Sequence, residues 1–160
     1  MTIQVGEKIP SLTLQHKTDE DVSDISTDEI FSGKKVVLFA LPGAFTPTCS
    51  AAHLPGYVVK ADELKQKGID LIVCLSVNDA HVMKAWGDQQ NVEGRIMMLA
   101  DGNCHFTNAV GLELDRSAGG MGIRSQRYAM IVDDGVVELL NVEAPMKFEV
   151  SDADTILNSL

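Results

Sequence analysis

The stretch that decides the fold runs from Val36 to Ser50 and reads VVLFALPGAFTPTCS. Its first part, Val36–Leu41, is a short apolar run between Lys34-Lys35 and Pro42-Gly43. Such a run predicts a central strand that is buried on both faces, and the proline-glycine pair forces an irregular turn after it. The remainder predicts a helix, so this stretch sets a helix start at the carboxyl end of a buried strand.

The helix start carries the first chemical signal. Pro47 suits the first helical position, because the amide that proline lacks would have no partner there, and Thr46 then becomes the N-cap. Cys49 falls in the first turn, where free N–H groups and the positive end of the helix dipole favour a thiolate. The alternative is a small apolar residue on the buried side of a helix. That alternative does not explain a thiol placed directly after Thr-Pro-Thr, so Cys49 is a candidate nucleophile.

Strands and helices alternate on both sides of this stretch. The expected helices cover residues 48–67 (ended by Gly68), 79–89, 104–110 and 151–160. The expected strands cover residues 11–16 (at a sheet edge), 69–77, 95–99, 127–133 and 136–142. Asp134-Gly135 predicts a hairpin turn between the last two, while 19–27 and the glycine-rich 117–123 are expected to be loops. With no internal repeat and no linker, the pattern predicts one α/β domain over residues 1–160, with a mixed central sheet flanked by helices.

Composition excludes two classes of partner. The 160 residues carry 13 Lys and Arg against 23 Asp and Glu, a formal net charge of −10. A surface this acidic repels nucleic-acid phosphates and anionic lipids, so neither is an expected partner. No apolar stretch approaches the length of a membrane span and no basic segment leads into an apolar run at the start, which together predict a cytoplasmic protein.

Three cysteines are an odd number with no disulfide-framework spacing. The absence of a CxxC motif argues against a thioredoxin-type dithiol and against a structural zinc site, so we expect no metal and no cofactor. Cys74 lies within an apolar strand and is expected to be buried and inert. The alternative is that Cys74 is a resolving cysteine. A disulfide between Cys49 and Cys74 requires their Cα atoms to lie within about 7 Å of each other. Cys104 follows an Asp-Gly-Asn turn and is expected to be partly exposed and incidental.

His53 stands four residues after Cys49, so both can face one side of a helix. This spacing admits a Cys–His dyad, as in a cysteine hydrolase, or two metal ligands. No third orienting residue and no second ligand cluster is evident in the sequence. We therefore favour a packing or polar-network role for His53.

The segment Pro42–Ser50, PGAFTPTCS, resembles the active-site signature of the peroxiredoxins, a group of AhpC/TSA-type redoxins. It is most similar to their type II, or peroxiredoxin-five-like, subfamily. The resemblance covers nearly the whole chain in order and continues through HLPG (53–56), CLSVND (74–79), Trp86, LAD (99–101), RSQR (124–127) and NVE (141–143). It implies a thioredoxin-like fold.

The resemblance also implies a reaction, the reduction of hydrogen peroxide and alkyl hydroperoxides in antioxidant defence. The Cys49 thiolate would attack one peroxide oxygen and become a sulfenic acid. Thr46 Oγ would hold the peroxide, and Arg124 would stabilise the thiolate and the leaving oxygen. Pro42 would shield the sulfur from water, and the backbone amides of Thr48 and Cys49 would complete the anion site.

The choice of Arg124 rests on the resemblance alone. By sequence alone an arginine at such a position is more often a surface charge. Arg116 and Arg127 lie close by in the chain, and only the resemblance ranks Arg124 above them.

The resemblance finally bears on the reductant and on assembly. Animal members of the subfamily carry a resolving cysteine just before the final helix, where this chain reads Phe148-Glu149-Val150-Ser151. An external thiol is therefore expected to reduce the sulfenic acid, with glutathione and glutaredoxin favoured and thioredoxin as the alternative.

The resemblance also implies a homodimer through Pro42–Phe45 and Asn78–Met83. A peroxide sensor that uses the same thiolate is the alternative function.

Overall fold

The computed structural model describes all 160 residues. Its strands are β1 (Thr13–Lys17), β2 (Val22–Ser26), β3 (Lys35–Ala40), β4 (Leu71–Ser76), β5 (Met97–Ala100), β6 (Glu113–Asp115), β7 (Ile123–Ser125), β8 (Tyr128–Asp133) and β9 (Val136–Val142). Its α-helices are α1 (Thr27–Phe31), α2 (Leu54–Gln66), α3 (Ala80–Gln89), α4 (His105–Ala109) and α5 (Ala153–Asn158). No helix is both long enough and apolar enough to cross a membrane.

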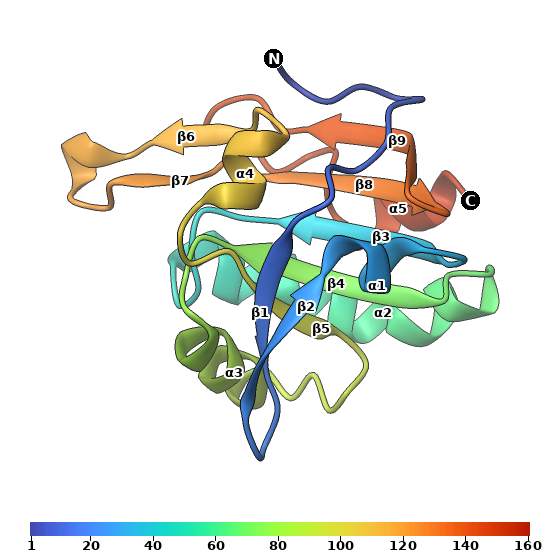
Figure 1. Ribbon diagram of the computed structural model, residues 1–160, viewed down its shortest axis with the longest axis horizontal. Coiled ribbons are helices and arrows are strands. Elements are labelled where there is room, and N and C mark those ends of the chain that lie inside the picture. Colours follow the sequence, from blue (N-terminus) through green and yellow to red (C-terminus); the bar gives the residue numbers. More distant parts are fainter.

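A seven-stranded mixed sheet in the order β2-β1-β5-β4-β3-β8-β9 forms the middle layer (Figure 1). Strand β3 runs parallel to β4 and antiparallel to β8, so it lies inside the sheet as the sequence predicted. A separate two-stranded ribbon, β6–β7, projects beyond the rest of the molecule. The mixed sheet with helices on both faces confirms the expected thioredoxin-like α/β fold.

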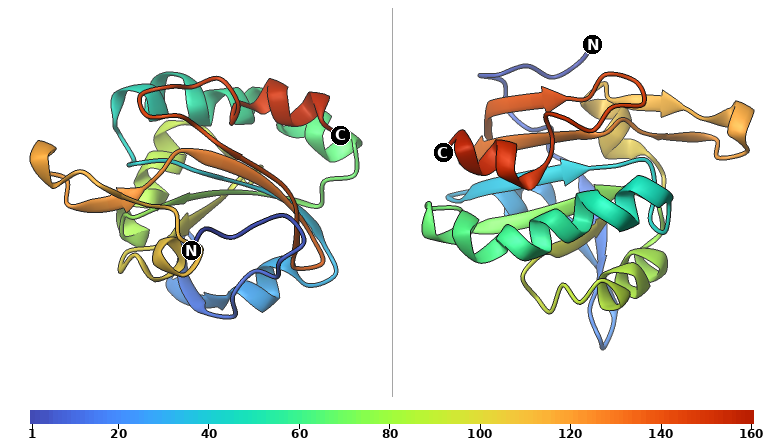
Figure 2. Two further views of the ribbon diagram at one scale, coloured as in Figure 1. Left: turned by 90° about the horizontal axis from the view of Figure 1, so that it is seen from above. Right: turned by 180° about the vertical axis from the view of Figure 1, so that it is seen from behind.

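Each face of the sheet has its own core. The side chains of Val37, Phe39 and Leu41 point to the face that α2, α3 and α5 cover. The alternate residues Val36 and Leu38 point to the opposite face, which α1 and α4 cover (Figure 2). Because successive side chains of a strand point to opposite faces, a strand buried on both faces must be apolar at every position.

The segment expected to be the loop 19–27 instead contains β2 and the start of α1. Ser26 caps α1: its hydroxyl accepts a hydrogen bond from the Glu29 amide and donates one to the Glu29 carboxylate. The sequence S-T-D-E has the capping-box pattern, and here the glutamate accepts its hydrogen bond from the Ser26 hydroxyl. Strand β2 is polar because it is the edge strand, with half-exposed and exposed side chains. Strand β1, expected at the edge, therefore pairs on both sides, with β2 and β5.

The turns agree more closely with those predicted from the sequence. Asp134 and Gly135 have φ angles of 48° and 81° and join β8 to β9, which confirms the hairpin. The glycine-rich segment 117–123 forms the tip of the β6–β7 ribbon, and its first residues make one turn of 3₁₀ helix (Ser117–Gly119). Asp152 caps α5 by accepting a hydrogen bond from the Thr155 amide, as expected for the last helix.

Asp101 provides a stability test. Its carboxylate is 1% exposed and accepts hydrogen bonds from the amides of Phe106 and Thr107 and from the Thr107 hydroxyl. Asp101→Ala leaves three donors unpaired, so we expect the free energy of unfolding to fall by about 3 kcal/mol in urea titrations. The control Asp62→Ala, at an exposed site, should change it by less than about 0.5 kcal/mol. Equal effects of the two changes would contradict this account of the α4 start.

Candidate active site

Cys49 lies at the carboxyl end of β3, in the first turn of the helical segment that leads into α2. The first helical hydrogen bond runs from the Ser50 amide to the Thr46 carbonyl at 2.9 Å, so the helix starts where Pro47 predicts. Residues Cys49–His53 form a turn of π-helix, closed by a bond from the Leu54 amide to the Cys49 carbonyl. The Cys49 side chain is fully buried. Single π-turns within α-helices are frequent at functional sites.

Arg127 is the cation that contacts the sulfur. Its Nη2 donates to Cys49 Sγ over 3.2 Å. The contact places a fixed positive charge directly against the sulfur.

The sequence-based choice of Arg124 is wrong in this respect. Arg124 Nε donates to the Met121 carbonyl at 2.9 Å, and its Nη1 lies 3.3 Å from the Val77 carbonyl and 3.5 Å from the Pro42 carbonyl. Arg124 therefore ties the β6–β7 ribbon to the turn after β3 without reaching the sulfur.

Strand register explains the difference between the two arginines. Strand β8 is antiparallel to β3, and Tyr128 pairs with Ala40. Residue 127 therefore stands beside the turn that follows β3, whereas Arg124 belongs to the projecting ribbon. The predicted strand 127–133 and its hairpin could have indicated Arg127, if antiparallel pairing with the strand before Pro42 had been assumed.

His53 fixes the orientation of Arg127. Arg127 Nη1 donates to His53 Nδ1 at 2.8 Å, so the other ring nitrogen, Nε2, carries the proton and donates to the Ser151 carbonyl at 3.1 Å. Burial and the adjacent Arg127 charge lower the pKa of His53 from 6.5 to about 3. The ring is therefore neutral at physiological pH, and its role is the expected polar network. A Cys–His dyad does not form here, because the nitrogen that faces the site is occupied by Arg127.

The segment between β9 and α5 closes the site from the other side. The Glu143 carboxylate accepts hydrogen bonds from the amides of Glu149, Val150 and Ser151 and from the Ser151 hydroxyl. Burial opposes ionisation of Glu143, but these hydrogen bonds outweigh it and hold the pKa of the carboxyl below its ordinary value. One carboxylate thus organises the whole segment.

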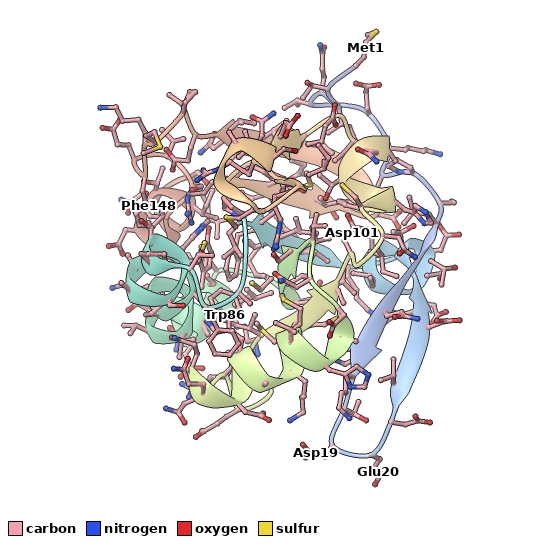
Figure 3. All side chains as sticks on the ribbon, turned by 90° about the vertical axis from the view of Figure 1, so that its left-hand side faces the viewer. Met1, Asp19, Glu20, Trp86, Asp101 and Phe148 are labelled. Atoms are coloured by element: carbon pink, nitrogen blue, oxygen red, sulfur yellow. The ribbon has the colours of Figure 1, made fainter.

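Phe148 extends from this segment over the site. Its ring centroid lies 4.9 Å from that of His53 and 5.7 Å from Arg127 Cζ. Figure 3 shows Phe148 beside the helical segment that follows Pro47. The segment that lacks a cysteine therefore lies directly against the site. Sequence reasoning gave neither Phe148 nor Glu143 a role of its own, although Glu143 belongs to the NVE motif.

The turn that carries Pro42 and Thr46 is held by hydrogen bonds at both ends. Thr46 Oγ1 donates to the Gly43 carbonyl at 2.7 Å, and the Ala44 amide donates to Asn78 Oδ1 at 2.9 Å. No hydrogen bond of the loops and helix ends uses the amide of Thr48 or Cys49, so both remain free for a ligand.

A cleft of about 400 Å³ lies next to Cys49, which does not itself line the cleft but contacts the lining residue Arg127. Its floor includes Pro42, Thr46, Thr48 and Arg127, and its walls come from the β6–β7 ribbon and the segment 143–148. Of the residues predicted for the site, Arg124 and the possible resolving residue Cys74 are not among those that line the cleft.

Comparisons with known proteins agree with this geometry. The family model described as Redoxin matches residues 4–157. Peroxiredoxin-2C of Arabidopsis thaliana is 47% identical to the chain over 99% of its length and 98% of the relative, and the chloroplastic peroxiredoxin-2E of the same plant is 48% identical over 99% and 70%. This chain belongs to the peroxiredoxins. It is a thiol peroxidase with an antioxidant role, and the relatives confirm the resemblance to the type II subfamily.

A solved structure supports the same assignment of this peroxiredoxin. The reduced Prx3 of Vibrio vulnificus in complex with H₂O₂ is 61% identical, with a TM-score of 0.95 and 99% of each chain covered. The oxidised form of that protein has a TM-score of 0.91 and covers both chains completely.

The other two thiols of the peroxiredoxin are enclosed. Cys74 lies within β4, fully buried, and burial raises the pKa of its thiol well above the ordinary value, with the nearby Cys49 adding to the effect. Cys104 precedes α4 and is 8% exposed, less than the sequence suggested. Burial likewise raises the pKa of the Cys104 thiol. All three cysteines are unpaired.

The two arginines can be separated by kinetics. Arg127→Gln removes the charge next to the sulfur and should lower the second-order rate constant for oxidation by H₂O₂ by about 10²- to 10³-fold. Arg124→Gln removes a contact to the turn and should lower the same rate constant by less than about 10-fold. Stopped-flow tryptophan fluorescence measures both, because Trp86 Nε1 donates to Ser50 Oγ next to Cys49. A larger loss in Arg124→Gln would reverse the assignment.

His53 gives a test by pH. The pKa of His53 is lowered in the folded protein. Below pH 6.5 the imidazole is therefore protonated in the unfolded chain, whereas in the folded protein it stays neutral down to about pH 3. Stability is therefore lost as the pH falls through this window. Between pH 7 and 5, the free energy of unfolding should fall by about 2 kcal/mol more in the wild type than in His53→Gln. Equal falls in chemical denaturation would refute a buried neutral His53.

Proposed function

We propose that Cys49 is the peroxidatic nucleophile and that Arg127, Thr46 and Pro42 surround the bound peroxide. The observation that carries the proposal is the 3.2 Å contact between Arg127 Nη2 and a fully buried Cys49 Sγ in the first turn of a helix. The reaction needs negative charge on the sulfur, and a fixed cation in direct contact with it is placed to stabilise that charge.

The chemistry follows from the donors and acceptors at the site. The thiolate attacks one peroxide oxygen, the O–O bond breaks, and the leaving oxygen takes the electron pair and a proton to become water or an alcohol. The Thr46 hydroxyl hydrogen is engaged with the Gly43 carbonyl, so Oγ1 accepts a hydrogen bond from the peroxide. Arg127 and the free amides of Thr48 and Cys49 can donate to the oxygens as charge develops. Pro42, which has no N–H, covers one side.

An external thiol is proposed to reduce the Cys49 sulfenic acid. The segment against the site offers Phe148 and no cysteine, and Cys74 is buried in the sheet with an elevated thiol pKa. Neither supports an internal disulfide. Glutathione with glutaredoxin is the favoured reductant, because a small thiol fits a cleft of about 400 Å³, and thioredoxin is the alternative.

Steady-state turnover tests this proposal. With H₂O₂ and glutathione, with or without glutaredoxin, the wild type and the control Cys104→Ser should turn over, while Cys49→Ser should lose essentially all activity. Peroxide consumption measured by a ferrous–xylenol orange assay follows the reaction. Activity that persists in Cys49→Ser would overturn the assignment of the nucleophile. Stoichiometric oxidation without turnover, whether with glutathione, with glutaredoxin or with thioredoxin in their place, would favour the sensor.

Assembly and location complete the proposal. We propose a homodimer through Pro42–Phe45 and Asn78–Met83, supported by Phe45, whose side chain is 51% exposed beside the site. A single monomeric species in sedimentation at micromolar concentration would contradict it. The three unpaired cysteines support a reducing compartment such as the cytoplasm.

A further inference from the structure

The cleft above Cys49 is cationic, although the protein as a whole is strongly acidic. Arg116, Arg127 and Lys147 line it, and Glu143 is the only acidic residue that does so. The chain carries a formal charge of −10. Cations gathered in a cleft focus the local potential and attract anionic ligands even when the net charge repels them.

Glu143 offsets only part of this charge. Its carboxylate is 8% exposed and is engaged by three backbone amides and the Ser151 hydroxyl. These donors belong to the segment that Glu143 organises. Its acceptor oxygens are thus engaged within that segment, and its single negative charge faces three cations in the lining.

Arg116 and Lys147 stand on the two walls of the cleft. Arg116 forms no salt bridge, and its backbone is fixed at the ribbon tip by its amide bond to the Gly122 carbonyl at 2.7 Å. The Lys147 amide bonds to the Ala144 carbonyl at 3.0 Å, and its ammonium reaches only the exposed Glu149 carboxylate at 3.9 Å. Exposed pairs at such distances are weak. Arg127, by contrast, is engaged with Cys49 and His53 at the floor.

We propose that this cleft binds small molecules that carry a carboxylate, with Arg116 and Lys147 as the carboxylate-binding residues and the reactive thiol or hydroperoxide directed at Cys49. The proposal deepens the proposed function and rests on Cys49 as the nucleophile. Two sources share this chemistry: glutathione, a thiol with two carboxylates, and hydroperoxides of carboxylic acids. Guanidinium and ammonium groups suit carboxylates.

Reduction of the sulfenic acid by glutathione takes two steps and needs no other reagent. The glutathione thiolate attacks the Cys49 sulfenyl sulfur, an S–S bond forms, and hydroxide leaves with a proton as water. A second glutathione thiolate then breaks this mixed disulfide, releases the Cys49 thiolate and forms glutathione disulfide.

Paired substrates that differ only in the carboxylate test the inference. Cys49 is oxidised with one equivalent of H₂O₂, and reduction by glutathione is compared with reduction by its diethyl ester in stopped flow. In the wild type the acid should react about 5- to 10-fold faster than the ester at low salt, and the ratio should fall as salt screens the charges. In Arg116→Gln/Lys147→Gln the ratio should approach 1. The control Arg95→Gln/Lys65→Gln, on a half-buried and an exposed cation outside the cleft, should keep the wild-type ratio.

A second arm uses a carboxylate-bearing alkyl hydroperoxide and its methyl ester as oxidants of reduced Cys49. If the rate ratio of acid to ester depends on the cleft charges only with the thiols, the ligand is the reductant. If it does so only with the hydroperoxides, the ligand is the substrate. Ratios near 1 in both arms for the wild type overturn the inference. Failure of H₂O₂ to form a sulfenic acid at Cys49 would instead overturn the proposed function, so the two failures are distinguishable.

Discussion

The site depends on one shared guanidinium. Arg127 donates through one amino group to Cys49 Sγ and through the other to His53 Nδ1. A cation that must stay beside a buried sulfur needs a neutral acceptor on its other side, because a protonated histidine would repel it. The pKa of His53, about 3, meets this condition at any physiological pH. Each remaining part of the site serves to keep this pair in place.

A chain of hydrogen bonds extends from His53 away from the sulfur. His53 can present Nδ1 as an acceptor only if Nε2–H has an acceptor of its own, and the Ser151 carbonyl provides it. Tyr57 donates to the same carbonyl at 2.8 Å. The position of Ser151 depends in turn on Glu143, which binds its amide and hydroxyl. A carboxylate at the end of β9 thus orients the guanidinium through one carbonyl and one imidazole. Phe148 packs against both the imidazole and the guanidinium.

The sequence predicted the strand, the turn and the helix start that carry Cys49, because burial on both faces leaves Val36–Leu41 no polar residue and Pro47 marks the first helical position. It did not predict which arginine reaches the sulfur. That choice depends on the register of β8 against β3, a long-range pairing that no local pattern encodes. Strand β2 was missed because an edge strand needs no apolar alternation, and the role of Glu143 was missed because its partners are backbone amides, which have no sequence signature.

Of three buried thiols, only Cys49 is in contact with a guanidinium, so Cys49 alone should react with peroxide. Mass spectrometry of the H₂O₂-treated protein, trapped with dimedone, tests it most directly. We expect a single dimedone adduct at Cys49, replaced by a glutathione mixed disulfide at the same residue when glutathione is present. An adduct at Cys74 or Cys104, or a disulfide between Cys49 and either of them, would contradict it.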